Sequence, residues 1–128
     1  MAHVLVIEDD PPSLELIRYL LHAAGHTVSC ATEGDAGLAR ARSGGLDLIV
    51  CDVQLPGIDG MEIARQLKAD PARRHIPLVA VTASAMVGDR RSVLRAGFDV
   101  YMAKPIVPET FVQQIEAVMR RSIAGTVG

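Results

Sequence analysis

The sequence predicts an α/β protein in which helices cover both faces of a five-stranded parallel sheet. Three observations support this fold class. Short apolar runs alternate five times with segments whose hydrophobic residues recur at helical spacing. The run at 46–52 is apolar on both faces after Asp47, as expected of a parallel strand buried between helices. The chain has 128 residues, 49% of them hydrophobic, which suits one domain around one core.

The five apolar runs are the predicted strands. They cover residues 3–7 (HVLVI), 27–31 (TVSCA), 46–52 (LDLIVCD), 76–83 (IPLVAVTA) and 100–104 (VYMAK). The segment 53–60 (VQLPGIDG), directly after the third run, is rich in turn-forming residues and predicts a loop.

The predicted helices follow the strands. The first, 11–25, has Leu14, Ile17 and Leu21 at helical spacing, and its proline and serine residues suit a helix start. The others cover 33–45, 61–70, 87–97 and 108–123, and the basic pair at 120–121 complements the dipole at the end of the last helix. We expect one domain over residues 1–123 and a frayed tail over residues 124–128.

The (βα)₅ alternation restricts the topology. Right-handed crossovers leave few solutions, and the flavodoxin-like strand order 2-1-3-4-5 is one of the two common doubly wound orders. Strands 2 and 3 then flank strand 1, which separates Cys30 and Cys51 by ~10 Å, too far for a disulfide bond. We expect both cysteines to be reduced and to lie in the core as small hydrophobic residues.

Composition excludes several classes of function. The net charge is −2 and no long basic block occurs, which argues against a nucleic-acid-binding surface. The four aromatic residues are too few for a base-stacking platform. No apolar segment approaches the ~20 residues needed to span a bilayer, and the N-terminal run lacks a cleavage site. A cytoplasmic protein is expected.

Polar residues that could bind a ligand or take part in catalysis follow the predicted strands. In open α/β sheets, ligands bind at the carboxyl ends of the strands, near the point between strands 1 and 3 where the order reverses. The side chains at these ends are Glu8, Asp9, Asp10, Asp52, Thr82 and Lys104, the last being one of two lysines in the chain. Carboxylates without a histidine or cysteine cluster suit a hard cation such as Mg²⁺.

Each of these residues also has a plainer interpretation. Asp52 could be a metal ligand, a nucleophile or a solvated acid at a strand end. Thr82 could be an ordinary β-branched strand residue, and Lys104 a surface lysine. Glu8 and Asp9 could stabilise the start of the first helix through its dipole, although Asp10 is better placed for that role. The four histidines show no ligand spacing.

Four fragments in a fixed order point to a family. They are VLVIEDD, DLIVCDVQLPGIDG, IPLVAVTA and YMAKP. Each is weak alone, but as an ordered set they resemble the receiver domain of two-component response regulators, over residues 3 to about 122. The resemblance implies a signalling domain that catalyses only its own phosphorylation and dephosphorylation.

The resemblance also implies roles for the acidic residues. Asp52 would accept a phosphoryl group from a phosphohistidine on a sensor histidine kinase or a histidine phosphotransfer protein. Asp9 and Asp52 would bind Mg²⁺ directly, together with the main-chain carbonyl of Gln54. Glu8 would act on the ion through water, and Asp10 lies one position beyond this acidic pair.

Other roles follow from the same resemblance. Thr82 would hydrogen-bond the phosphoryl group and Lys104 would pair with it, before a candidate cis peptide at Lys104–Pro105. Tyr101 would change rotamer with phosphorylation, although it could be a half-exposed strand aromatic. Gln54 and Ser84 would tune the lifetime of the phosphoryl group.

Because the sequence ends soon after its last helix, we expect a stand-alone regulator that signals through its fourth helix, fifth strand and fifth helix. A phosphorelay intermediate that passes the phosphate onward is an alternative. The segment 75–91 (HIPLVAVTASAMVGDRR) favours the cell-cycle type of regulator over the motility type. An aspartate-nucleophile phosphatase usually has a second Asp two residues on, where this chain has Gln54. A flavin carrier lacks support, and so does a receiver-like module without phosphate acceptance.

Overall fold

The computed structural model describes residues 2–83 and 89–127, and the side chains of residues 2–83 and 90–121. Five parallel strands form one sheet in the predicted order β2-β1-β3-β4-β5. The strands are β1 (His3–Ile7), β2 (Thr27–Ala31), β3 (Leu48–Asp52), β4 (Leu78–Thr82) and β5 (Val100–Ala103).

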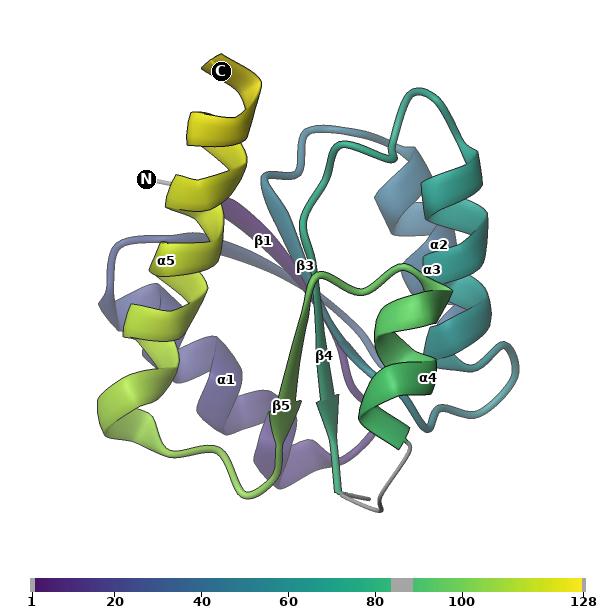
Figure 1. The fold of residues 1–128 in the computed structure, drawn as a ribbon. Coiled ribbons are helices and arrows are strands. Elements are labelled where there is room, and N and C mark those ends of the chain that lie inside the picture. Colours follow the sequence, from purple (N-terminus) through teal and green to yellow (C-terminus); the bar gives the residue numbers. More distant parts are fainter. Residues whose placement is uncertain (1, 84–88, 128) are drawn as a thin grey trace.

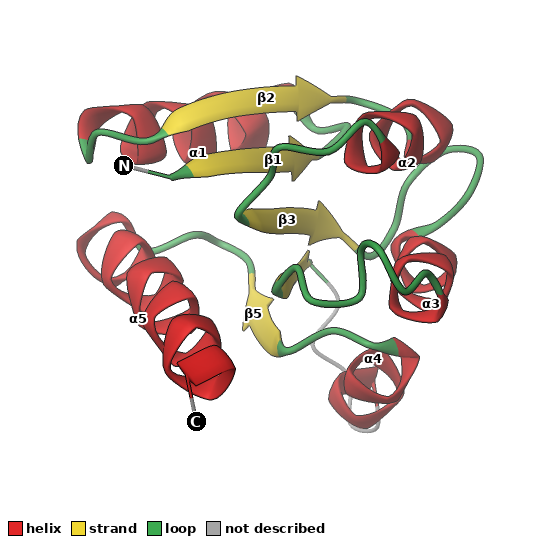
Figure 2. Cartoon of the chain, turned by 90° about the horizontal axis from the view of Figure 1, so that it is seen from above, coloured by secondary structure: helices red, strands yellow, loops and turns green. Residues whose placement is uncertain are grey.

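Five helices alternate with these strands. They are α1 (Pro11–Ala23), α2 (Gly34–Arg42), α3 (Gly60–Ala69), α4 (Asp89–Ala96) and α5 (Pro108–Val127). Figures 1 and 2 show α1 and α5 on one face of the sheet and α2, α3 and α4 on the other. The predicted doubly wound α/β fold is therefore confirmed.

Each face of the sheet has its own hydrophobic cluster, because alternate side chains of a strand point to opposite faces. Leu5 and Ile7 of β1 pack with α2, α3 and α4, whereas Val4 and Val6 pack with α1 and α5. Phe98 belongs to the first cluster and Phe111 to the second, and the remaining core is largely aliphatic. The sheet is thus buried on both faces, and its strand ends are held in a fixed arrangement.

Two predicted strands begin later than their apolar runs. β4 starts at Leu78, because Pro77 has no amide hydrogen to donate to a strand ladder. β3 starts at Leu48, after Asp47, whose side chain accepts a 2.8 Å hydrogen bond from the His3 amide. The fifth strand ends at Ala103, one residue before the predicted end at Lys104.

The predicted end of the last helix was wrong. Helix α5 continues past Ile123 to Val127. No proline stands between these residues to end the helix. Helix α4 begins at Asp89, and the predicted start at 87 lies outside the described residues.

The expectation of two core cysteines was half wrong. Cys51 of β3 is buried, but Cys30 is exposed because β2 is an edge strand with a partner on one side alone. Both thiols are free. Among the described residues, none of the helices combines the length and apolar character that crossing a membrane requires.

Candidate functional site

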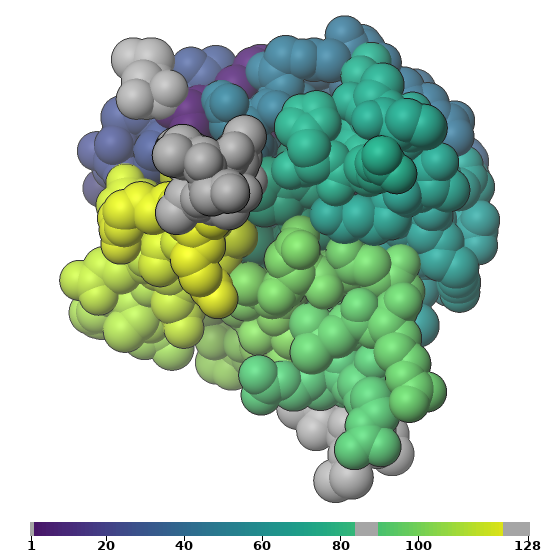
Figure 3. Space-filling view, turned by 45° about the horizontal axis from the view of Figure 1, so that its top comes forward, coloured from purple at the N-terminus to yellow at the C-terminus, as the bar shows by residue number. Residues whose placement is uncertain are grey.

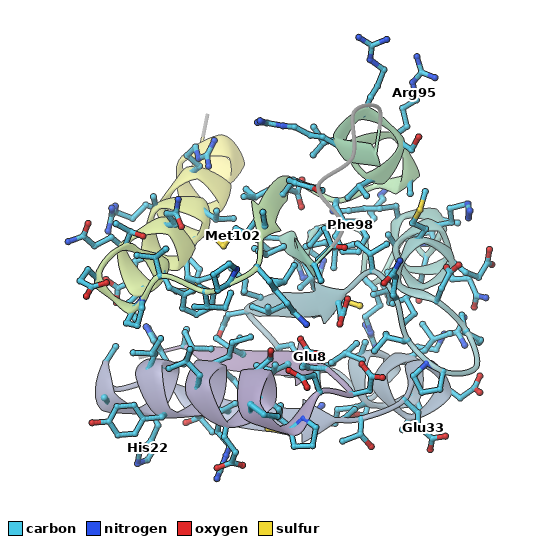
Figure 4. The ribbon with its side chains drawn as sticks, turned by 90° about the horizontal axis from the view of Figure 1, so that it is seen from below. Glu8, His22, Glu33, Arg95, Phe98 and Met102 are labelled. Carbon is cyan, nitrogen blue, oxygen red and sulfur yellow. The ribbon has the colours of Figure 1, made fainter. Side chains whose placement is uncertain are left out.

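The pairing of β1 with β3 brings the strand-end acids together. Ile7 pairs with Cys51, so the next residues, Glu8 and Asp52, lie side by side at the carboxyl edge of the sheet. The Glu8 amide continues the ladder by donating a 3.0 Å hydrogen bond to the Ala31 carbonyl of β2. Figure 4, which views this edge, shows Glu8 near its centre, between the two layers of helices.

Three carboxylates converge at this edge. One oxygen from each of Glu8, Asp9 and Asp52 lies within 4.8 Å of the others. Glu8 and Asp52 are 1% and 6% exposed, whereas Asp9 is open to solvent. A partly accessible cluster of carboxylate oxygens is the ligand chemistry of a hard divalent cation.

Lys104 reaches this cluster from the end of β5. Its Nζ lies 2.8 Å from Oε1 of Glu8 and 3.1 Å from Oδ2 of Asp52. Its amide donates a 2.8 Å hydrogen bond to the Thr82 carbonyl, and its peptide bond to Pro105 is cis, as the family resemblance implied. The sequence placed Lys104 at the correct edge, and the structure makes it the counter-ion of two buried acids.

The surroundings of Glu8 and Lys104 shift the pKa values of both side chains. Burial, helped by the neighbouring Asp52, raises the pKa of Glu8 to about 7, against the opposing effects of Lys104 and the Asp10 amide. Burial would lower the pKa of Lys104, but its contacts with Glu8 and Asp52 raise it overall. The site therefore favours a protonated Lys104 and holds Glu8 close to its titration point at neutral pH.

The chemistry of these oxygens supports the fit of a cation to the cluster. Oε1 of Glu8 lies 2.8 Å from Nζ of Lys104, so the ammonium already supplies its opposite charge. Buried carboxylates are costly unless a charge or a hydrogen-bond donor meets them. The oxygens of Glu8, Asp9 and Asp52 lie within 4.8 Å of one another and are ligands of the kind that Mg²⁺ prefers.

Asp10 belongs to the helix start and lies outside the carboxylate cluster. It is the N-cap of α1, where its Oδ2 accepts hydrogen bonds from the Ser13 amide at 3.3 Å and the Ser13 hydroxyl at 2.6 Å. These bonds lower the pKa of Asp10. The interpretation of Asp10 as the cap of the first helix is confirmed.

Thr82 and Gln54 complete the described edge. Thr82 ends β4, next to β3, and is 3% exposed. The Gln54 amide donates a 3.0 Å hydrogen bond to Oδ1 of Asp52, and its side chain is exposed. Both residues lie beside Asp52, as the strand ends predicted for Thr82 and the family resemblance implied for Gln54.

Residues 4–116 match the model of the response regulator receiver domain. The chain belongs to this family.

Relatives of the receiver domain support the assignment. The polar-differentiation response regulator DivK of Brucella ovis is 38% identical over 114 residues, which cover 89% of this chain and 93% of DivK. The solved receiver domain of the sensor histidine kinase PA1611 from Pseudomonas aeruginosa superposes with a TM-score of 0.82. It is 30% identical over 96% of this chain and 98% of its own, and its structure has a magnesium ion coordinated in the active site cleft.

A further solved structure shares the fold. A CheY-like receiver domain protein from Methanospirillum hungatei superposes with a TM-score of 0.90, covering 98% of each chain at 24% identity. Its five-stranded, doubly wound architecture is the one described above.

Two further residues were predicted to take part in this receiver domain, Tyr101 and Ser84. Tyr101 is half-buried on β5 and packs against the cluster formed with α2, α3 and α4. Ser84 lies outside the described residues.

The sequence reasoning missed one positioning residue, Gly60. A Cβ atom at Gly60 would lie 2.4 Å from the Asp52 carbonyl oxygen and 2.8 Å from Cα of Val53. The Gly60 amide donates a 2.9 Å hydrogen bond to the Val53 carbonyl, so α3 begins against the end of β3. The sequence signal for this contact is the pair Asp59-Gly60 at the helix start. The same pair is common in ordinary turns, so by itself it does not reveal that the Asp52 carbonyl lies close to Gly60.

Proposed function

We propose that this receiver domain accepts a phosphoryl group on Asp52 in a Mg²⁺-dependent reaction. The observation that carries the proposal is the surroundings of Asp52. Its buried carboxylate shares a cluster with Glu8 and Asp9, and the Lys104 ammonium lies 3.1 Å away. This combination provides a nucleophile, oxygen ligands for a cation, and a fixed positive charge in one place.

The chemistry requires positioning more than covalent work. A carboxylate oxygen of Asp52 attacks the phosphorus of a phosphohistidine, a P–O bond forms, and the P–N bond breaks. The leaving histidine nitrogen retains the electron pair of that bond and takes up a proton. Negative charge on the equatorial phosphoryl oxygens must be stabilised, and Lys104 and Thr82 are proposed to supply donors for them.

Asp9 and Asp52 are proposed to hold Mg²⁺ directly, with the main-chain carbonyl of Gln54, and Glu8 through water. When bound, the ion would neutralise charge on the carboxylates and the phosphoryl oxygens. The magnesium in the cleft of the Pseudomonas aeruginosa receiver domain supports this assignment.

Receiver domains of response regulators interact with histidine kinases or phosphotransfer proteins, and we propose such a donor here. Signalling would occur in the cytoplasm of a bacterium, through a change in the surface of α4, β5 and α5 that involves Thr82 and Tyr101. Gln54 and Ser84 would adjust the lifetime of the phosphoryl group.

The test is incubation with acetyl phosphate, with and without Mg²⁺, followed by intact-mass measurement. We expect one added phosphoryl group that requires Mg²⁺ and is lost in the Asp52→Asn variant. Steady turnover of a generic phosphomonoester would favour a phosphatase instead. An absence of labelling with any donor, from a folded protein, would refute the assignment of Asp52 as acceptor.

A further inference from the structure

A second polar cavity lies at the opposite end of the sheet from the carboxylates. It has a volume of about 340 Å³ and lies between the end of α3, the connection to β4, the start of β5 and the part of α5 that carries Val118 and Arg121. Its charged lining comprises Lys68, Arg74, His75, Asp99 and Arg121. Figure 3 tilts this end toward the reader, with teal atoms of the α3–β4 region, green atoms of the β5 region and the yellow part of α5 around it.

The acid in this cavity is already neutralised. Oδ2 of Asp99 accepts a 2.7 Å hydrogen bond from the Leu78 amide and lies 3.3 Å from Nζ of Lys68. Lys68 also donates to the carbonyls of Arg74 and Ile76, at 3.1 Å and 3.2 Å. Lys68 and Asp99 therefore form the structural floor of the cavity and contribute little net charge.

Two guanidinium groups are left without an acid. Within residues 2–83 and 90–121, the side chains of Arg74 and Arg121 make no hydrogen bond or ion pair, and both are exposed. They line the same cavity although they lie far apart in the sequence, and His75 adds a further donor. Because the whole chain has a net charge of −2, this concentration of positive charge is local.

We infer that this cavity binds a small anion with two or more phosphate groups. Planar guanidinium groups donate paired hydrogen bonds that match phosphate oxygens. Two guanidinium groups in one cavity suit a diphosphate better than a singly charged anion. The volume lies at the lower end of the range for small-molecule sites. No aromatic residue is among the described lining residues, so recognition is through the phosphates and not through stacking on a base.

The inferred site is separate from the phosphoacceptor. The cavity lies at the start of β4 and β5, whereas Asp52, Thr82 and Lys104 lie at the opposite strand ends. A strand of five residues spans roughly 13 Å, so an anion held here does not compete for the carboxylate cluster. The two sites can therefore be tested independently.

The test is calorimetric titration of the full chain with pyrophosphate, in EDTA so that no metal complex binds at the carboxylates. We expect saturable binding that weakens with added salt. Arg74→Gln and Arg121→Gln should each weaken it by about tenfold, as for the loss of one charge-assisted hydrogen bond. Arg95→Gln on α4, whose side chain points away from the body of the protein in Figure 4, is the control with the same charge change and should bind as the parent does.

Titration with ADP and with adenosine distinguishes the source of the phosphates. Equal affinity for ADP and pyrophosphate assigns recognition to the diphosphate, and tighter binding of ADP assigns additional contacts to the nucleoside; both support the site. Binding of adenosine alone, an equal loss in Arg95→Gln, or no saturable binding would overturn it. Labelling of Asp52 by acetyl phosphate should persist in Arg74→Gln and Arg121→Gln, so failure here is distinguishable from failure of the proposed function.

Discussion

At the scale of single residues, the carboxylates of Glu8 and Asp52 pose the main electrostatic problem of the site. Two unit charges ~4 Å apart repel by roughly 4 kcal/mol at an effective dielectric near 20. The structure offsets this repulsion with the Lys104 ammonium, which contacts both acids, and with the raised pKa of Glu8. The exposed Asp9 adds a third carboxylate to the cluster, and its repulsion of the other two would be offset by a bound cation.

Asp9 and Asp10 are adjacent acids that should behave differently. Asp9→Asn removes a cluster oxygen, so we expect it to abolish Mg²⁺-dependent labelling by acetyl phosphate. Asp10→Asn retains an oxygen that can cap α1, so labelling should remain largely intact. Intact-mass measurement over time compares the two, and equal losses in both variants would contradict the separate roles.

Glu8 should make the metal-free protein less stable as the pH rises. Its pKa is about 7 in the folded protein and 4.5 ordinarily, so the folded state binds this proton more tightly than the unfolded chain does. The free energy of unfolding therefore falls between pH 4.5 and about 7, by up to about 3 kcal/mol. Glu8→Gln removes this loss.

Denaturant unfolding in EDTA at pH 5 and pH 8 measures the effect. The stability of Glu8→Gln relative to the parent should be higher at pH 8 than at pH 5. Asp10→Asn is the control, because the pKa of Asp10 is lowered and its titration lies below this window. A relative stability of Glu8→Gln that stays constant or falls with pH would show that Glu8 does not titrate there.

Replacing Lys104 should leave two buried acids without their counter-ion. We expect Lys104→Gln to lower the free energy of unfolding by about 1–3 kcal/mol at pH 8, and by less at pH 6, where Glu8 is protonated more often. Phosphoryl labelling should also slow, because a donor for the phosphoryl oxygens is lost.

The other lysine provides the control for this experiment. Lys68→Gln also breaks an ion pair, but Asp99 is 46% exposed and makes a backbone hydrogen bond of its own. The loss of stability in Lys68→Gln should change little between pH 6 and pH 8. The same pH dependence in both variants would argue that the Lys104 effect does not arise from Glu8.

At the scale of elements, the junction between β3 and α3 positions the proposed acceptor. Asp59 caps α3 by accepting a 2.9 Å hydrogen bond from the Glu62 amide, and Gly60 lets the helix begin against the Asp52 carbonyl. The loop of residues 53–59 thereby returns the start of α3 to the end of β3, and the Asp52 side chain is held at the sheet edge.

Neighbouring substitutions separate capping from close packing at this junction. Asp59→Ala should cost about 1 kcal/mol of stability, because one cap bond is lost, and labelling should be retained. Gly60→Ala should cost about 1–3 kcal/mol and also slow labelling, because its Cβ displaces the backbone of Asp52 and Val53. Unchanged labelling in Gly60→Ala would contradict its positioning role.

The alternation of apolar runs with helical patterns predicted the ten strands and helices. The residues at the carboxyl ends of the strands predicted which side chains form the site. Glu8, Asp52, Thr82 and Lys104 could be placed at one edge because parallel strands end together. The contact of Lys104 with both acids, and the need for Gly60, depend on side-chain and backbone distances that no sequence pattern encodes. The late start of β4 could have been predicted from Pro77, whereas no stop signal in the sequence marks where α5 ends.

At the scale of the whole molecule, the carboxylates at one sheet edge connect to the face formed by β5 and α5. Lys104 follows β5 directly, and Tyr101 lies on that strand. A cavity of about 240 Å³ between β5 and α5 is lined by Tyr101, Ile106 and Val107, and Val107 is 52% exposed. In the proposed signalling, a change at Lys104 would reach this surface through β5.

Amide hydrogen exchange can test this direction of coupling. With acetyl phosphate and Mg²⁺, we expect altered exchange in peptides that cover 89–114, and little change in peptides that cover α1 and β2. Asp52→Asn under the same conditions is the control for direct effects of the reagents. Changes confined to α1 and β2 would contradict signalling through α4, β5 and α5.

The position of the phosphoryl group in the chain decides whether Asp52 is the acceptor. Borohydride reduces an aspartyl phosphate to homoserine, which peptide mass mapping assigns to one position in the chain. After acetyl phosphate and Mg²⁺, we expect homoserine at position 52, and none when Mg²⁺ is omitted. Homoserine at another acidic residue, with Asp52 unmodified, would show that Asp52 is not the acceptor.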